Sequence, residues 1–256
     1  MPFDLAMVRS QLACLEAEPR IEWHSSIGST MTEASRLAAA GAPSGTVVGA
    51  DEQNLGQGRH GRSWHSEYES GLYISIILRR QFTPVTLPVV TLALGLAVRD
   101  AILKATNLVC DLRWPNDVLI QSKKCAGILA QLEGSAIIAG IGVNVNHSSF
   151  PLELSDTATS LRLASGRVHS REKLLVELLA SVDAWCTLLE TEGRAAVIET
   201  FSRVSSFVFG RRVSVDQDGS LICGTTAGLN DSGFLILRGD DGGSSLILAG
   251  GVRPCS

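Results

Sequence analysis

The chain has 256 residues, of which 45% are hydrophobic and 19% are charged, and its formal net charge is -4 at pH 7. This composition excludes a disordered or fibrous chain and supplies enough apolar residues for one large domain, alone or with a small one. A mildly acidic chain lacks the overall basic balance of nucleic-acid binders, so we predict no nucleic-acid partner.

The cysteines and the amino terminus indicate a reducing compartment. No cysteine in the sequence belongs to a Cys-x-x-Cys pair or stands at zinc-binding spacing from a histidine, so free thiols are expected. Asp4 and Arg9 interrupt any apolar leader, and the longest apolar run, Leu87 to Val98, is shorter than the roughly 20 residues that cross a bilayer. We therefore predict a cytoplasmic protein with no membrane partner.

The first half of the chain has the pattern of a sheet with helices. Gly41 is well placed to end one helix, and Thr86 to cap another whose first turn tolerates Pro88. Residues 51–66 form a polar, Gly-rich loop. In chain order we predict a short amphipathic helix over residues 4–17, a strand over 21–26, a helix over 32–40, strands over 45–50 and 72–78, and a helix over 87–104.

The second half begins with short strands and continues with helices. Ser170 caps a predicted helix that ends near residue 189, because apolar residues recur there at spacings of three and four. A further helix is expected over 195–204. The strands are predicted over residues 109–114, 118–120, 127–133 and 136–145, the last two joined by a hairpin turn at Gly134-Ser135.

The last 50 residues or so change character, with short strand candidates between turn signals. They predict a small β-barrel. We expect it to pack against the larger domain, because so small a unit has only marginal stability when it folds alone. The fold class is therefore α+β: a mixed β-sheet domain with helices over residues 1–206, then the barrel over 207–256. The strand candidates are 212–215, 221–225, 234–237 and 245–248, and the turn signals are Asp218-Gly219, Ser232-Gly233 and Gly242-Gly243.

The densest functional signal is Gly56-Gln57-Gly58-Arg59-His60-Gly61-Arg62-Ser63-Trp64. Glycines let a ligand approach the backbone, arginines bind phosphate, and tryptophan offers a flat face to a ring, so the segment favours a loop that closes over a nucleotide. It matches the G-x-G-x-x-G of dinucleotide sites, but a strand follows and no acidic residue occurs between Ser70 and Arg99. A flexible surface loop with incidental arginines stays open as the alternative.

A lysine and two polar residues stand beside the next strands. Asn116 and Asp117 follow Pro115, where they could simply satisfy a turn. Lys124 begins an otherwise apolar strand, and an inward lysine there needs an anion such as a ligand's carboxylate or phosphate. The alternative is a lysine at the edge in solvent, as expected for Lys123.

Glycines interrupt a later apolar strand, Gly140-Ile141-Gly142-Val143-Asn144. Glycine within a strand often marks the close approach of a ligand or of another backbone. Asn144 could contact the polar edge of such a ligand. A bulged strand without a ligand explains the same pattern equally well.

Taken in this order, the segments resemble the biotin–protein ligase family. The family's motifs are a Gly-Arg-Gly-Arg-x-Gly-Arg-x-Trp loop, Lys-Trp-Pro-Asn-Asp with a following Lys-x-x-Gly-Ile-Leu, and Gly-x-Gly-x-Asn. They stand here as GQGRHGRSW, RWPNDV, KCAGIL and GIGVN. The family's Ser-Thr, glutamine and downstream motifs are matched by Gly28-Ser29-Thr30-Met31, Asp51-Glu52-Gln53 and Ala158-Thr159-Ser160-Leu161.

The resemblance implies an ATP-dependent ligase that forms biotinyl-5'-AMP and transfers biotin to a lysine of a biotin carboxyl carrier protein domain. It implies a catalytic domain of the class II synthetase-like, biotin–lipoate ligase type, followed by an SH3-like barrel. Biotin and ATP are the implied substrates, with Mg2+ bound to ATP and no fixed protein metal site. Homodimerisation is a further implication.

The resemblance also implies roles for individual residues. The catalytic residues would be Lys124, Arg59, Arg62 and Asp117. The biotin-binding residues would be Ser29, Thr30, Gln53, Gly56, Gly58, Arg59, Lys124, Gly127, Gly140 and Gly142. The nucleotide-binding residues would be Arg59, Gly61, Arg62, Trp64, Asn116, Asp117 and Asn144.

The sequence departs from the family pattern at three positions. Gln57 replaces the first arginine of the loop and removes a cation, Arg113 replaces a lysine and keeps the charge, and Met31 replaces an asparagine and removes a hydrogen-bonding group. The repressor branch of the family carries an amino-terminal winged helix-turn-helix, and residues 1–20 are too few for one, so no DNA-binding domain is expected.

Three alternatives belong to other functional classes. A lipoate or octanoyl ligase resembles this fold and chemistry, and the arginine-rich loop with Trp64 and the small barrel favour biotin over it. A biotin-sensing or DNA-binding regulator is disfavoured by the acidic balance. A nicotinamide-dependent oxidoreductase is disfavoured by the strand that follows the glycine-rich loop.

Overall fold

A computed structural model describes residues 3–13, 19–217 and 220–255. The helices are α1 (Leu5–Leu12), α2 (Thr30–Ala39), α3 (Leu87–Thr106), α4 (Leu161–Ser165), α5 (Arg171–Thr191) and α6 (Arg194–Val204), with 3-10 turns η1 (Arg59–Gly61) and η2 (Pro84–Thr86). The first strands are β1 (Ile21–His24), β2 (Val47–Ala50), β3 (Gly71–Leu78), β4 (Asp111–Arg113), β5 (Asp117–Ile120), β6 (Lys123–Glu133) and β7 (Ala136–Asn144). The last are β8 (Phe209–Gln217), β9 (Ser220–Leu229), β10 (Leu235–Arg238), β11 (Ser244–Ile247) and β12 (Val252–Pro254).

Within these described ranges the strands form two sheets. The larger has seven strands in the order β1-β2-β3-β7-β6-β5-β4, and the smaller has five in the order β11-β10-β9-β8-β12. β1 runs parallel to β2, and the other neighbouring strands are antiparallel. A mixed sheet with helices, followed by a small antiparallel sheet of the SH3-like kind, confirms the predicted α+β class.

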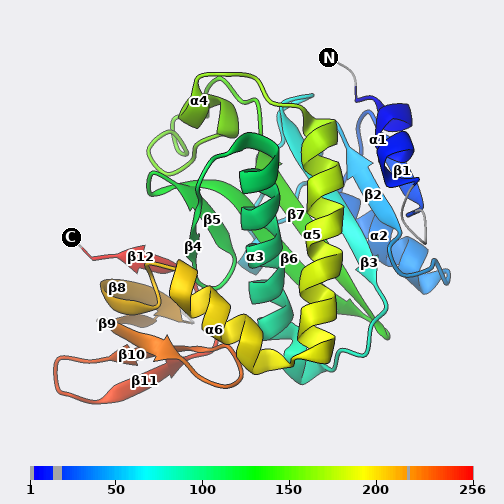
Figure 1. Cartoon of the computed structure of the whole chain (residues 1–256). Coiled ribbons are helices and arrows are strands. Elements are labelled where there is room, and N and C mark those ends of the chain that lie inside the picture. Colours follow the sequence, from blue (N-terminus) through cyan, green and yellow to red (C-terminus); the bar gives the residue numbers. More distant parts are fainter. Residues whose placement is uncertain (1–2, 14–18, 218–219, 256) are drawn as a thin grey trace.

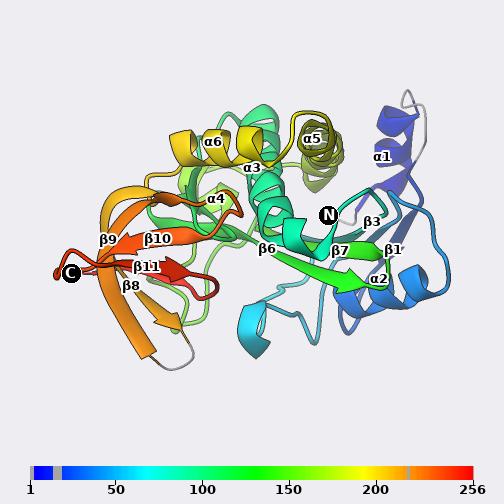
Figure 2. The same ribbon diagram turned by 90° about the horizontal axis from the view of Figure 1, so that it is seen from below.

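Helices cover the two faces of the large sheet unequally. α3, α5 and α6 lie on one face and α2 lies on the other (Figures 1 and 2). The first face carries the main apolar core, which includes the fully buried Leu92 and Leu96 of α3 and Leu178 of α5. A smaller apolar cluster joins Met31 of α2 to Ile138 of β7 on the second face. Much of the second face is therefore left for the loop that follows β2.

α3 is the central helix of the main core. The stretch from Pro84 to Thr106 is long and apolar enough to cross a bilayer by length and composition, so the expectation that no segment reaches this length was wrong. The helix packs instead on the sheet beside α5 (Figures 1 and 2), and Val89, Ala93 and Ala97 are fully buried. Burial on several sides explains why α3 lacks a polar face.

Local signals set several element ends as predicted. Ser170 accepts a hydrogen bond from the backbone N–H of Lys173 at 3.0 Å, which caps α5. Gly41 follows α2 with φ +86°, a conformation that favours glycine. Thr86 precedes α3, but its side chain closes a capping box with Thr83 on η2 instead of capping α3. The hairpin between β6 and β7 turns at residues 134–135, as expected.

Other boundaries differ from the predictions. α1 ends at Leu12, short of residue 17, and residues 14–18 lie outside the described ranges, as does the Asp218-Gly219 turn. α4 and β12 were not predicted, because five and three residues are too few to show a period. α4 is fixed locally, by Ser160 at its start and Gly166 in a left-handed conformation at its end. The described cysteines are free thiols, as expected.

The small sheet packs against one end of the large one (Figures 1 and 2). Val213, Val215 and Leu235 of the small sheet belong to the same apolar cluster as α3. Across the junction, the indole N–H of Trp114 donates a hydrogen bond to the carbonyl of Gly233 at 2.9 Å. These contacts agree with a barrel that packs against the larger unit, while the division at residue 206 stays a prediction.

Candidate active site

A cavity opens on the face of the large sheet opposite α3. Its wall combines polar groups from α2, the segment after β2 and the loop of residues 56–64 with the floor formed by β6 and β7. Of the predicted site residues, those that line it are Thr30, Gln53, Gly58, Arg59, Trp64, Asn116, Lys124, Gly127, Gly140 and Gly142. Those outside its lining are Ser29, Gly56, Gly61, Arg62, Asp117 and Asn144.

One end of the cavity is a hydrogen-bonded cluster of neutral side chains. Gln53 accepts hydrogen bonds from the backbone N–H and the hydroxyl of Thr30, at 2.8 and 3.0 Å. Ser75 donates to the Thr30 hydroxyl at 2.9 Å from the neighbouring β3. The hydroxyl of Ser29 is buried and has no hydrogen-bond partner among the described residues. This end therefore offers neutral donors and acceptors suited to a polar, uncharged ring.

Ser75 was missed by sequence reasoning. It is fully buried in β3, where it is the one polar side chain between Leu72 and Leu78 apart from the hydroxyl of Tyr73. A buried hydroxyl in an apolar strand needs a partner, and that requirement could have marked it as a candidate.

A buried ion pair anchors the segment that carries Gln53. Asp51 follows β2 directly, and its carboxylate accepts a hydrogen bond from the guanidinium of Arg171 at 2.7 Å. The two side chains are only 8% and 4% exposed. Arg171, the first residue of α5, also donates to the carbonyl of Gly71 at 3.4 Å. The pair therefore ties the start of α5 to the strand ends that border the cavity.

The loop of residues 56–64 is folded back on itself. The backbone N–H of Gly58 donates to the carbonyl of Arg62 at 2.7 Å, and that of Trp64 donates to Gly56 at 2.9 Å. Gly61, with φ +71°, makes the turn. A side chain at Gly56 would lie 2.7 Å from the carbonyl oxygen of Trp64. The loop therefore has a defined hairpin shape, which argues against a structureless surface loop.

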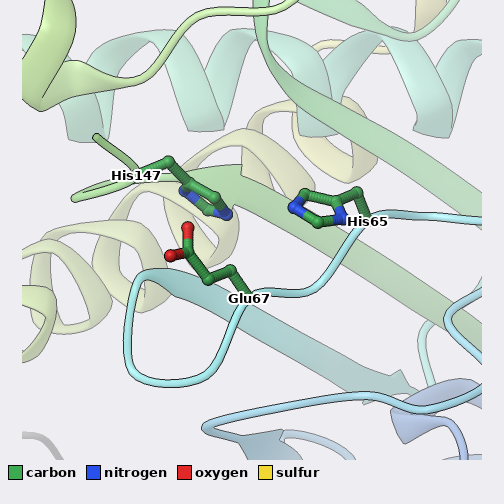
Figure 3. A group of neighbouring side chains, drawn as sticks. All are labelled: His65, Glu67 and His147. Carbon is green, nitrogen blue, oxygen red and sulfur yellow. The ribbon is translucent and has the colours of Figure 1, made fainter. Parts of the chain in front are cut away.

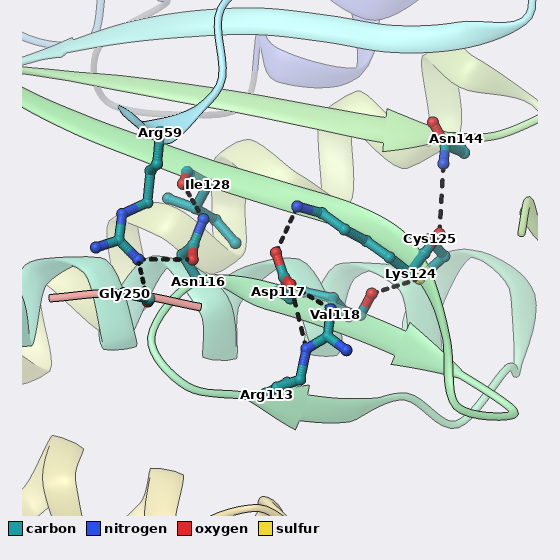
Figure 4. A network of polar contacts seen from close by, with 10 residues as sticks. All are labelled: Arg59, Arg113, Asn116, Asp117, Val118, Lys124, Cys125, Ile128, Asn144 and Gly250. Atoms are coloured by element: carbon teal, nitrogen blue, oxygen red, sulfur yellow. Dashed lines mark hydrogen bonds and ion pairs between the residues drawn. The ribbon is translucent and has the colours of Figure 1, made fainter. Parts of the chain in front are cut away.

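Arg59 projects from this loop toward the other end of the cavity (Figure 4). Its guanidinium donates to the side-chain oxygen of Asn116 at 3.1 Å and to the carbonyl of Gly250 at 3.3 Å. Burial lowers the pKa of Arg59, and Asp117 opposes that shift. Arg62 is exposed on the outer side of the loop. The two arginines are thus not equivalent: Arg59 is already at the site, and Arg62 is not.

Trp64 covers the sheet where two of the predicted glycines lie. A Cβ at Gly142 would stand 2.5 Å from the indole Cε2, and one at Gly127 would stand 2.9 Å from Cζ3. Gly140 instead faces Met31, whose sulfur would lie 2.5 Å from an added Cβ. The glycines were predicted to admit a ligand. They also make room for Trp64 and Met31, so a ligand and these side chains share the same floor.

We expect Gly142→Ala to disturb the site strongly, although the substitution adds only one methyl group. A methyl group at 2.5 Å from a rigid indole forces Trp64 off the sheet, so any activity of this site should fall by about tenfold or more. Gly95→Ala on α3 is the control, because its added Cβ meets only ordinary contacts at 3.7 Å. Steady-state activity assays on both variants check this, and equal rates would contradict the close packing of Trp64.

Lys124 is held by a carboxylate rather than exposed (Figure 4). Its ammonium lies 2.5 Å from a carboxylate oxygen of Asp117, and Arg113 lies 2.6 Å from the other oxygen. Burial alone would raise the pKa of Asp117, but the two cations outweigh it and lower that pKa. Asp117 is therefore ionised, and it orients Lys124 beside the Trp64 ring, 5.3 Å from its centroid.

Asn144 supports the strand that carries Lys124. Its amide donates to the carbonyl of Thr159 at 3.1 Å, and the backbone of Lys124 pairs on both sides with residues 157 and 159. The Ala-Thr-Ser-Leu motif thus forms a short parallel bridge to Lys124. In this arrangement Asn144 is turned toward the backbone, and its predicted contact with a nucleotide requires a shift of its amide.

The chain was compared with known proteins. The model of the Biotin/lipoate A/B protein ligase family matches residues 23–148. The bifunctional ligase/repressor BirA of Bacillus subtilis is 34% identical, over 86% of this chain and 70% of that protein. The biotin–[acetyl-CoA-carboxylase] ligase of Mycobacterium tuberculosis is 31% identical, over 88% of this chain and 84% of that protein.

Solved structures show the same similarity. A biotin protein ligase from Aquifex aeolicus, in complex with biotin and ATP, is 30% identical and superposes with a TM-score of 0.83. The match covers 92% of this chain and 99% of that one. The similarity in structure therefore extends over nearly the whole chain, including most of the residues described above.

Proposed function

This chain belongs to the biotin protein ligase branch of the biotin/lipoate A/B protein ligase family, and from that premise we propose that it forms biotinyl-5'-AMP and transfers biotin to a carrier lysine. The acceptor is a lysine of a biotin carboxyl carrier protein domain. The observation that carries the proposal is the cavity, which joins a neutral polar end at Thr30 and Gln53 to a cationic end at Arg59 and Lys124. Biotin has the matching polarity, with a neutral ureido ring and a carboxylate at the end of an apolar chain.

Biotin binds along the sheet in this proposal. Its ureido ring meets Thr30 and Gln53, which line the cavity. Ser29 lies outside that lining, and its buried hydroxyl, which has no partner among the described residues, reaches the ring only when it turns inward. Its valeryl chain lies over the glycines of β6 and β7. Its carboxylate ends beside Arg59 and Lys124, where both cations balance its charge.

The first chemical step joins two anions. A carboxylate oxygen of biotin attacks the α-phosphorus of ATP, and pyrophosphate leaves with the electron pair of the broken P–O bond. Lys124 and Arg59 stabilise the charge that accumulates between the reactants. No carboxylate that could hold a metal ion lines the cavity among the described residues. In this proposal Mg2+ would therefore be carried in by the phosphates of ATP, where it would add positive charge.

The nucleotide lies on the side of Trp64 and Asn116 in this proposal. The indole offers a flat face to adenine, and its buried N–H has no partner among the described residues. Gly61 and the exposed Arg62 reach the phosphates only when the loop of residues 56–64 moves inward. Closure of that loop keeps water from the mixed anhydride until the carrier domain binds.

The second step transfers the biotinyl group to the carrier. A neutral lysine amine attacks the acyl carbon, an N–C bond forms, and AMP leaves with the electrons of the C–O bond. We assign Asp117 to holding Lys124 in place, because a paired carboxylate with a lowered pKa is a weak base. In this proposal Asp117 therefore acts through Lys124 and not as a catalytic residue itself.

Arg59→Ala is expected to release the reactive intermediate early. The substitution removes two hydrogen bonds of a charged donor, to Asn116 and Gly250, that hold the loop over the site. Biotinyl-AMP should appear in solution about tenfold faster than from the parent protein. Arg36→Ala, which changes an exposed arginine on α2, is the control. An unchanged half-life of the bound intermediate would refute the role of Arg59 in retention.

Transfer of labelled biotin to a purified carrier domain tests the proposed function. The protein, ATP and Mg2+ are incubated with a biotin carboxyl carrier domain, and in parallel with a lipoyl domain and labelled lipoate. We expect label on the biotin carrier alone. Label on the lipoyl domain alone would assign the chain to lipoate chemistry, and tight biotin binding without transfer would make it a sensor. The cytoplasmic location and a dimeric state stay predictions.

A further inference from the structure

A second group of chemically capable side chains lies outside the cavity (Figure 3). His65 and Glu67 belong to the segment that leaves the loop of residues 56–64, and His147 follows the end of β7. The three side chains converge, and one ligand atom from each lies within 4.8 Å of the others. Two imidazoles and one carboxylate at this spacing are a donor set for a metal ion.

The surrounding structure holds these residues in place. His147 is fully buried, and its ring stacks on Phe150 with centroids 5.1 Å apart. Its backbone carbonyl accepts a hydrogen bond from Ser160 at 2.7 Å. The carbonyl of Glu67 accepts one from the hydroxyl of Tyr73 at 3.1 Å. Both chain segments are therefore fixed by contacts that do not use the ligand atoms of His65 and Glu67.

His147 has a nitrogen with no hydrogen-bond partner. Its Nε2 lies 3.1 Å from the Tyr73 hydroxyl, which has one hydrogen and donates it to the carbonyl of Glu67. Nε2 therefore carries its own hydrogen toward Tyr73, and Nδ1 keeps an unshared electron pair. Nδ1 is buried and unpartnered among the described residues. A second imidazole nitrogen fixed by a hydrogen bond is the usual companion of a metal-binding one.

We propose that His65, Glu67 and His147 bind a divalent transition metal ion of the Zn2+ class. Imidazole donors favour Zn2+, Co2+ or Ni2+ over Mg2+, which prefers oxygen donors. The ion would join the residue after Trp64 to the end of β7, and so fix one end of the loop over the cavity. The site is separate from the Mg2+ that enters with ATP, and it does not depend on the proposed function.

Metal binding without any substrate tests this site. The full chain carrying Cys223→Ser and Cys255→Ser serves as the parent, because these two neighbouring thiols outside the core are competing zinc ligands. Zn2+ is titrated by calorimetry, and Co2+ by its visible absorption. We expect one ion per chain and a rise in Tm with Zn2+.

The variants His65→Ala and Glu67→Gln should each weaken binding by roughly tenfold or more and abolish the rise in Tm. Both residues lie on an irregular segment, where the substitutions leave the core intact. His60→Ala, at a histidine of the same loop outside the cluster, should bind Zn2+ like the parent. The proposal is overturned if the parent binds no Zn2+ or Co2+, or if both ligand variants bind as tightly as the parent.

Discussion

Replacing Lys124 with alanine is expected to slow the formation of biotinyl-AMP by about 100-fold or more. Lys124 is the cation that Asp117 holds at the cavity wall, and its charge offsets the repulsion between the biotin carboxylate and the α-phosphate of ATP. The loss concerns the chemical step, so it should appear in a single turnover with saturating substrates. Rapid-quench measurement of biotinyl-AMP or pyrophosphate gives that rate directly.

Lys123 is the matched control for this experiment. It is the preceding residue on the same strand, but its ammonium donates to the carbonyl of Ser155 at 2.9 Å and does not line the cavity. Lys123→Ala should therefore keep nearly the parent rate. If Lys124→Ala formed the adenylate within about twofold of the parent, the stabilising role of Lys124 would be wrong.

Replacing Arg171 with methionine is expected to lower the free energy of unfolding by about 3–5 kcal/mol. The substitution leaves the carboxylate of Asp51 buried without its ion-pair partner, at a position only 8% exposed. Urea denaturation followed by circular dichroism measures the loss. Because Asp51 precedes Gln53, the variant should also bind biotin more weakly.

An exposed pair and a double variant separate charge from packing. Arg36→Met breaks a pair with Glu33 whose arginine is 64% exposed, and it should leave the free energy of unfolding nearly unchanged. Combining Arg171→Met with Asp51→Leu removes both charges and should recover much of the lost stability. A double variant as unstable as the single one would indicate that shape, not the stranded carboxylate, sets the cost.

Local signals in the sequence predicted most of the large elements. Ser170, Gly41 and the Gly134-Ser135 turn act through neighbours a few residues away, so the pattern alone indicated where elements begin and end. α4 escaped prediction because it depends on Ser160 as a cap and on packing, with no period of its own. α3 was predicted to within two residues of its end, although Arg99 and Asp100 interrupt its apolar run.

The chemistry of the site was more predictable than its internal contacts. Lys124, Arg59 and Gln53 were expected at a ligand, and all three line the cavity. The pairing of Asp117 with two cations depends on how β4, β5 and β6 pair, and the turn of Asn144 toward backbone carbonyls depends on where the chain returns near Thr159. Such contacts are set by the tertiary fold, and a single sequence without an alignment gives no signal for them.

The order of strands places the cavity across a seam between two parts of the chain. β1, β2 and β3 form one part of the large sheet and β4 to β7 the other, and they meet where β3 pairs with β7, Ser75 opposite Gly140. Thr30 and Gln53 belong to the first part, and Lys124 to the second. A molecule in the cavity contacts both.

Ligand binding and formation of the complete sheet are therefore thermodynamically coupled. The first part carries Thr30, Gln53 and Arg59, and the second carries Lys124 and the glycines of β6 and β7, so only the fully assembled sheet gains the whole binding free energy. The β3–β7 pairing joins residues 59 to 73 positions apart, and pairings between residues so distant in the sequence form slowly. A substrate that spans this seam therefore protects the pairing that the chain itself finds hardest to form.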